Sequence, residues 1–81
     1  YKSIQSANVL IKNGERNAAT IISEMLKKIK TADSANPDYI KVVNSSSFNE
    51  VETLTDGETY YILLACRFGK TRLIDNELII L

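Results

Sequence analysis

Three basic residues near the carboxyl end, Arg67, Lys70 and Arg72, are the side chains of this sequence that could bind an anionic ligand. Arginine holds phosphate oxygens through paired hydrogen bonds and lysine acts as a point charge, so this group could contact the phosphates of a nucleotide. Alternatively, Arg67 pairs with Asp75 or Glu58 across a sheet, while Lys70 and Arg72 are solvated. The residue types alone favour this structural role.

The tripeptide Gly69-Lys70-Thr71 is similar to the end of a phosphate-binding loop, but the rest of that motif is missing. The motif requires a glycine at position 64, where this chain has Leu64. It also requires a helix afterwards, whose amino end faces the phosphates, whereas Thr71 to Ile74 has the composition of a strand. We therefore do not assign a phosphate-binding loop.

The chain contains no histidine and one cysteine, Cys66. The absence of histidine excludes Ser-His and Cys-His nucleophilic machinery and histidine-based metal sites. A single cysteine excludes an internal disulfide and a zinc site built on several thiolates. Because Cys66 lies within an apolar run, we expect it to be a small buried hydrophobe. We therefore expect that the chain is not a complete enzyme, and we assign no catalytic residue and no metal ligand.

Composition limits the partners of the chain. The 81 residues include ten lysines and arginines and ten aspartates and glutamates, so no net charge attracts nucleic acid or an anionic membrane. No apolar run approaches the roughly 20 residues of a membrane helix, and the amino end lacks the blocks of a signal peptide. We expect one small cytoplasmic domain that buries about 60% of its unfolded surface.

Two amphipathic helices are expected in the first part of the chain. The first runs from Tyr1 to Lys12 and ends at Asn13-Gly14, because glycine can adopt the left-handed conformation of a helix cap. No capping residue precedes Tyr1, which suggests that the chain starts in the middle of a longer protein. Its apolar face consists of Ile4, Ala7, Leu10 and Ile11.

The second helix is expected from Glu15 to Lys30. Glu15 suits the positive end of the helix dipole, and the three lysines of the last turn suit the negative end. Its apolar face is predicted to consist of Ala18, Ile22, Met25, Leu26 and Ile29. Thr31 to Asp38 is polar, contains the only proline of the chain and is predicted to be a loop.

The last part of the chain is predicted to form a sheet. Tyr60 to Cys66 is uninterruptedly apolar, which is typical of a central strand covered on both faces. Gly69-Lys70 is the expected turn of an antiparallel hairpin between Tyr60–Arg67 and Thr71–Ile74. Tyr39 to Val43 is rich in β-branched residues and predicts another strand.

Two segments leave alternatives open. Val51 to Leu54 fits either a short strand or an ordered loop, with Val51 and Leu54 as its anchors. Glu77 to Leu81 either extends the last strand or adds an edge. The predicted fold class is α+β with two layers, in which two amino-terminal helices pack on a small antiparallel sheet that ends in a hairpin.

The hairpin sequence RFGKTRLIDN, residues 67–76, resembles the carboxyl-terminal signature of the pantoate-beta-alanine ligase (pantothenate synthetase) family. NPDYIKVV, residues 36–43, resembles the Pro-Asp-Tyr strand of the same family, although Asn44 stands where members commonly have aspartate. The helices leading to this strand also fit, so the resemblance covers essentially all 81 residues.

The resemblance implies a function for a longer protein. Family members condense (R)-pantoate with beta-alanine through a pantoyl-adenylate, consuming ATP with Mg²⁺ and releasing AMP and diphosphate. A Rossmann-type amino-terminal domain binds the nucleotide and forms the homodimer, and a small carboxyl-terminal domain closes over it as a lid. The resemblance therefore implies that residues 1–81 are this lid, without the amino-terminal domain.

The family's His-x-Gly-His and Ser-Arg-Asn motifs are absent from this chain, so no catalytic residue is transferred to it. The lid alone is expected to be a monomer, to be inactive and to bind no ATP. Arg67, Lys70 and Arg72 become candidate contacts with the phosphates or with the other domain. The alternative, from another class, is a non-enzymatic module that binds a protein partner through its helix pair or an open sheet edge.

Overall fold

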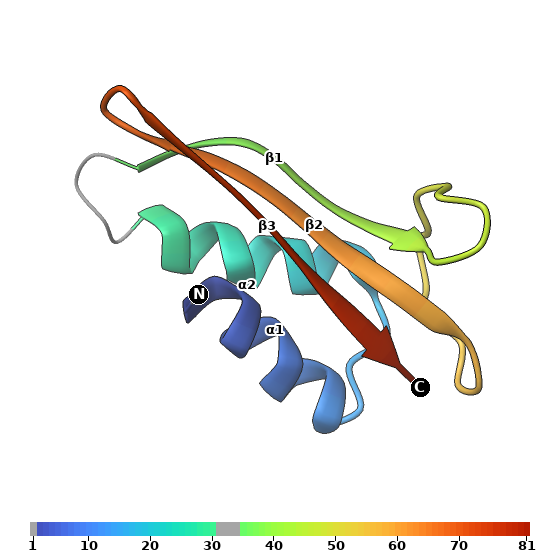
Figure 1. Cartoon of the computed structure of the whole chain (residues 1–81). Coiled ribbons are helices and arrows are strands. Elements are labelled where there is room, and N and C mark those ends of the chain that lie inside the picture. The colour runs from blue at the N-terminus through green and yellow to red at the C-terminus, as the bar shows by residue number, and fades with distance from the viewer. Residues whose placement is uncertain (1, 31–34) are drawn as a thin grey trace.

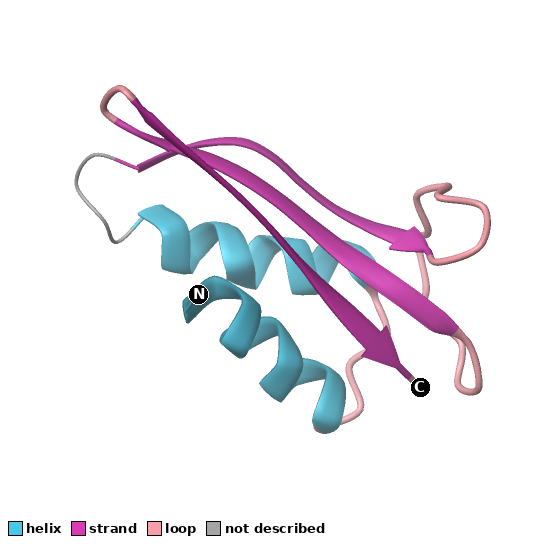
Figure 2. Ribbon diagram, viewed as in Figure 1, coloured by secondary structure: helices cyan, strands magenta, loops and turns pink. Residues whose placement is uncertain are grey.

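The chain forms a helical layer on one face of a three-stranded antiparallel sheet (Figure 1). The computed structural model describes residues 2–30 and 35–81. Its elements are α1 (Lys2–Lys12), α2 (Ala18–Lys30), β1 (Ala35–Asn44), β2 (Thr59–Phe68) and β3 (Thr71–Ile80). Both helices lie on the same side of the strands, and β2 lies between β1 and β3 (Figure 2). This arrangement confirms the predicted α+β class.

The first helix matches its prediction closely. Ile4, Ala7 and Ile11 are buried and Leu10 is half-buried, so the predicted face is the one that packs. At its end Gly14 adopts a φ of 101°, and its amide donates to the carbonyl of Ile11 at 3.1 Å. Glycine reaches this conformation without the steric cost that a Cβ would bring.

The second helix begins at Ala18, and the prediction that it begins at Glu15 is wrong. Asn17 is the capping residue, because its Oδ1 accepts a hydrogen bond from the amide of Thr20 at 3.1 Å. Glu15 lies before the cap, where its Oε2 accepts from the amides of Arg16 and Asn17. Its carboxylate therefore orders the connection between the helices and is not part of the first helical turn.

Most of the predicted face of α2 is buried, with one omission. Ala18, Met25 and Ile29 are buried as expected. Ile21 was not in the predicted set, yet it is fully buried, whereas Ile22 and Leu26 are half-buried. Because α2 packs against both α1 and β1, its buried stripe is displaced from the predicted one.

The hairpin is as predicted, and its strands are longer. Gly69-Lys70 connects Phe68 to Thr71, which are paired across β2 and β3. Gly69 has a φ of 59°, in the left-handed region that favours glycine. β3 continues to Ile80, so the tail from Glu77 extends the last strand.

The two faces of β2 differ, and the prediction that both are covered is wrong. Alternate residues Tyr60, Ile62, Leu64 and Cys66 are buried in the core formed with the helices. On the opposite face Ala65 is buried, whereas Tyr61 and Leu63 are only half-buried. This open face continues onto β3, where Ile74, Leu78 and Ile80 are exposed. Cys66 is a buried free thiol, as expected.

The connection between β1 and β2 is an ordered loop, which settles the alternative left open for Val51 to Leu54. Single bridges join Val43 to Glu50 and Asn17 to Thr53. Leu54 is buried and Val51 packs against the core from a half-buried position. These contacts fasten the loop to both layers.

The segment predicted as a loop from Thr31 to Asp38 is partly a strand. Residues 31–34 lie outside the described residues. From Ala35 onward the chain is already β1, which pairs with β2 through Pro37. Proline is tolerated here because β1 is an edge strand.

Ser3 is buried in α1, and its hydroxyl has no hydrogen-bond partner among the described residues. A buried hydroxyl without a partner costs about 1–3 kcal/mol. Ser3→Ala is therefore expected to raise the Tm of the 81-residue chain in a thermal unfolding experiment. Ser23→Ala, at an exposed position of α2, controls for the higher helix propensity of alanine. An equal gain from both variants would contradict the prediction.

Candidate basic site at the hairpin end of the sheet

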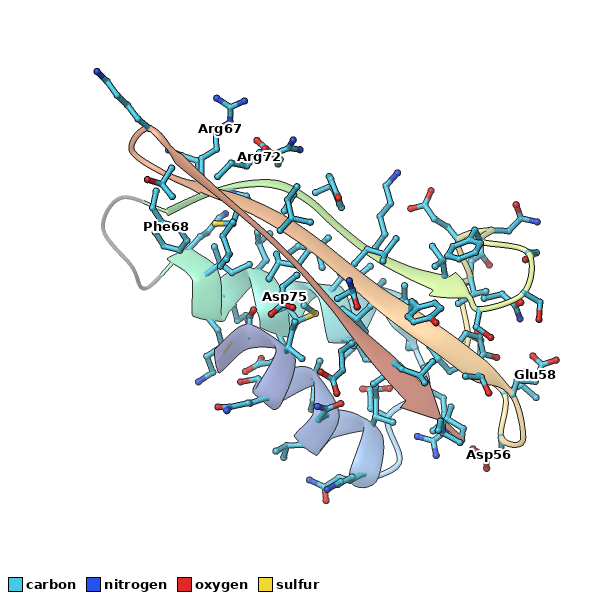
Figure 3. All side chains as sticks on the ribbon, in the orientation of Figure 1. Asp56, Glu58, Arg67, Phe68, Arg72 and Asp75 are labelled. Atoms are coloured by element: carbon cyan, nitrogen blue, oxygen red, sulfur yellow. The ribbon has the colours of Figure 1, made fainter. Side chains whose placement is uncertain are left out.

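Two of the three candidate residues lie side by side. Arg67 on β2 is directly opposite Arg72 on β3, next to the Gly69-Lys70 turn. Both project from the open face of the sheet (Figure 3). Like charges directly opposite each other in an antiparallel pair are destabilising, so a nearby anion relieves the repulsion.

That anion is Asp38 of β1. Its Oδ2 lies 3.0 Å from Nε of Arg72, which donates a hydrogen bond, and 3.5 Å from Nε of Arg67. The three side chains are 47%, 61% and 30% exposed for Arg72, Arg67 and Asp38, respectively. One carboxylate from the opposite edge strand therefore lies between two guanidiniums.

The partners expected for Arg67 in a structural role, Asp75 and Glu58, are wrong. Asp75 is opposite Leu64, on the helix-facing side of the sheet, and its Oδ1 accepts from the amide of Asn76. Glu58 lies beside the far end of β2, where its Oε2 accepts from the hydroxyl of Tyr60 (Figure 3). Neither carboxylate is near the hairpin end.

Sequence reasoning missed Asp38 because it placed this residue in a loop. The pairing of β1 with β2 shifts between Pro37 and Tyr39, so Asp38 is an extra residue, as in a β-bulge. The sequence signal that could have indicated this position is a proline followed by an aspartate at the edge of a predicted strand. Pairing across three strands was needed to show which arginines it reaches.

Lys70 is not part of the ion-paired group. It lies exposed in the turn, at the tip of the hairpin beyond both arginines. Two guanidiniums outnumber the one carboxylate, and Lys70 adds a further positive charge nearby. The hairpin end therefore has a positive potential that suits an anionic ligand.

Two shallow grooves lie elsewhere on the surface. One of about 440 Å³ runs between α1 and α2, and one of about 490 Å³ lies between α1 and the end of β3. Neither is lined by Arg67, Lys70 or Arg72. Within residues 2–30 and 35–81, no group of three or more acidic or cysteine side chains could hold a metal ion, and no helix is long and apolar enough to cross a membrane.

Comparison with known proteins identifies the family. The family model described as pantoate-beta-alanine ligase matches residues 1–78. The pantothenate synthetase of Chloroherpeton thalassium is 45% identical over 76 residues, which cover 93% of this chain and 27% of that protein. That of Syntrophomonas wolfei is 39% identical over 79 residues, covering 98% of this chain and 27% of the relative.

A solved structure shares the fold. The crystal structure of the pantothenate synthetase from Thermus thermophilus superposes with a TM-score of 0.82 at 19% identity. The match covers 95% of this chain and 27% of that chain. The chain thus spans 27% of the length of the relatives named above, and its sequence and fold agree. It belongs to the pantoate-beta-alanine ligase family.

Proposed function

We propose that residues 1–81 form the carboxyl-terminal lid domain of an ATP-dependent pantoate-beta-alanine ligase. The observation that carries this proposal is the family match over residues 1–78, within a chain that spans 27% of its relatives. The longer enzyme condenses pantoate and beta-alanine through a pantoyl-adenylate. Membership of a ligase family favours this function over a non-enzymatic interaction module.

In this proposal the lid has two tasks. It excludes water from the acyl-adenylate, which hydrolyses when exposed, and it completes the nucleotide site when it closes. The remaining part of the enzyme is a Rossmann-type amino-terminal domain that binds ATP with Mg²⁺ and forms the homodimer. The lid alone is inactive, binds no ATP and is monomeric, and the enzyme is cytoplasmic.

The basic residues of the hairpin end are the proposed contacts with phosphates or with the amino-terminal domain. Arg67 and Arg72 are held through Nε, and an arginine held in this way can still offer its Nη groups to an oxyanion. Lys70 supplies a point charge from the tip of the turn. A lid that presents these groups on closing would neutralise charge on the departing diphosphate.

Arg72→Ala in the longer enzyme is expected to lower the rate of adenylate formation roughly 10- to 100-fold, the scale of one lost charged hydrogen bond to a phosphate. Its Tm should change little, because Arg72 is half-exposed and such ion pairs contribute at most about 1 kcal/mol. Pantoate-dependent diphosphate release measures the first quantity, and thermal unfolding measures the second.

Lys27→Ala is the matched control, since it removes one positive charge from an exposed position of α2. Its rate of adenylate formation should equal that of the unsubstituted enzyme. Unchanged rates for both Arg72→Ala and Lys70→Ala would remove the hairpin end from the phosphate site.

A further inference from the structure

We infer that Asp38 is a positioning residue that sets the spacing and direction of the Arg67 and Arg72 guanidiniums for a phosphate-type anion. The inference builds on the proposed function, because it assigns a role to a residue that supports the proposed phosphate contacts. It begins from an unfavourable feature, the direct opposition of two arginines in neighbouring strands. Without a shared anion, the two side chains would repel each other and spread apart.

The backbone of β1 is shaped to bring this anion to the right face. Pro37 is paired with Cys66 and Tyr39 with Ala65, which leaves Asp38 as the extra residue between them. Bulges re-aim a side chain that regular alternation would send to the other face. Pro37, opposite Cys66, lies on the helix-facing side, so alternation counted from Pro37 puts Asp38 on the open face. The extra residue keeps Tyr39, opposite Ala65, on that face as well. Asp38 therefore lies on the open face, where its carboxylate reaches both arginines.

The geometry of the contacts suits a positioning role. A single oxygen, Oδ2, lies within 3.5 Å of Nε of both arginines. The hydrogen bond from Nε fixes the plane of the Arg72 guanidinium, and the ion pair at 3.5 Å draws the Arg67 guanidinium toward the same oxygen. The Nη groups of both arginines remain suited to bind an oxyanion from the solvent side. The two guanidiniums are therefore oriented before the anion binds, and less side-chain entropy is lost on binding.

Stability alone is a weak reason for this arrangement. The three side chains are between 30% and 61% exposed, and ion pairs at that exposure stabilise a fold only slightly. If Asp38 only neutralised the arginines, it would oppose anion binding, since its own charge repels the ligand. Positioning and neutralisation therefore predict opposite signs for the loss of this charge.

The test uses two substitutions of Asp38 in the longer enzyme. For each variant the KM for ATP and the inhibition constant of inorganic diphosphate are measured. Asp38→Asn removes the charge, and Asp38→Glu keeps it but moves the carboxylate by one methylene. A positioning role predicts that both variants raise the KM for ATP and the inhibition constant of diphosphate by about threefold to fivefold. This is the scale of an exposed charge pair. Glu50→Gln, an exposed residue that follows the other end of β1, makes the same charge change and should have no effect.

A second readout does not depend on activity. In the 81-residue chain, the Nε–H signals of Arg67 and Arg72 report how tightly each guanidinium is held. We expect NMR order parameters for both groups to fall in Asp38→Asn and to stay unchanged in Glu50→Gln. A dispersed amide spectrum identifies variants that remain folded, so loss of the fold is recognised separately.

Several results would overturn the inference. Tighter diphosphate binding by Asp38→Asn, or wild-type constants for Asp38→Glu, would reduce Asp38 to a neutralising charge. Equal guanidinium order in Asp38→Asn and the unsubstituted chain would do the same. These outcomes differ from failure of the proposed function, in which the longer enzyme forms no pantothenate. They also differ from loss of the proposed phosphate contacts, in which Arg72→Ala and Lys70→Ala both leave adenylate formation unchanged.

Discussion

Leu64→Ala is expected to lower the free energy of unfolding by about 2–5 kcal/mol, the range for truncating a fully buried leucine. Leu64 is 0% exposed on the helix-facing side of the central strand. Small domains have only about 5–15 kcal/mol of stability in total, so this variant would lose a large share of it. Urea denaturation of the 81-residue chain, followed by circular dichroism, measures the change.

Leu63→Ala is the matched control for this prediction. Leu63 is the preceding residue on the same strand, but its side chain is half-buried on the open face. The surrounding solvent can fill the space left there, so the loss should be clearly smaller. Equal losses for the two variants would mean that the helical layer does not cover β2 as described.

Arg16→Ala is expected to lower the free energy of unfolding by about 1–3 kcal/mol, because it removes charged hydrogen bonds from a partly buried position. Nη1 of Arg16 donates to the carbonyls of Ile11 and Glu15 at 2.7 and 2.9 Å. Nε donates to Oδ1 of Asp56 at 2.8 Å. The side chain therefore caps the carboxyl end of α1 and connects it to the turn before β2. Urea denaturation again provides the measurement.

Two variants separate the sources of this effect. Asp56→Ala removes the ion pair alone, and its 80% exposure makes a loss of at most about 1 kcal/mol expected. Arg16→Lys keeps the charge but lacks the planar guanidinium that contacts two carbonyls and the carboxylate together. Its free energy of unfolding should therefore lie between those of Arg16→Ala and the unsubstituted chain. If Asp56→Ala costs as much as Arg16→Ala, the carbonyl contacts contribute nothing.

The parts of the fold that depend on neighbouring residues could be predicted from the sequence. The α1 stripe follows from helical periodicity, and the β2–β3 hairpin follows from Gly69-Lys70 between two apolar segments. Both features are set within a few residues along the chain. The start of α2 was misplaced because Glu15 and Asn17 are both plausible before a helix, and only the hydrogen bond to Thr20 distinguishes them.

Features that depend on which layers meet could not be predicted in the same way. The run from Tyr60 to Cys66 is apolar on both faces, but the helices cover only one of them. Likewise, Arg67 and Arg72 were recognised as candidates, while Asp38 was not, because it comes from another strand through an irregular register. The sequence therefore predicts the basic residues of the candidate site, but not the carboxylate that lies between them.

The order of packing in this domain follows the order of the chain. The main contacts join α1 to α2, α2 to β1, β1 to β2 and β2 to β3. Each of these contacts joins two elements that are consecutive along the chain. The strand pairs still join residues that are distant in the chain, such as Ala35 and Phe68, so a folding rate between those of helical bundles and all-β domains is expected.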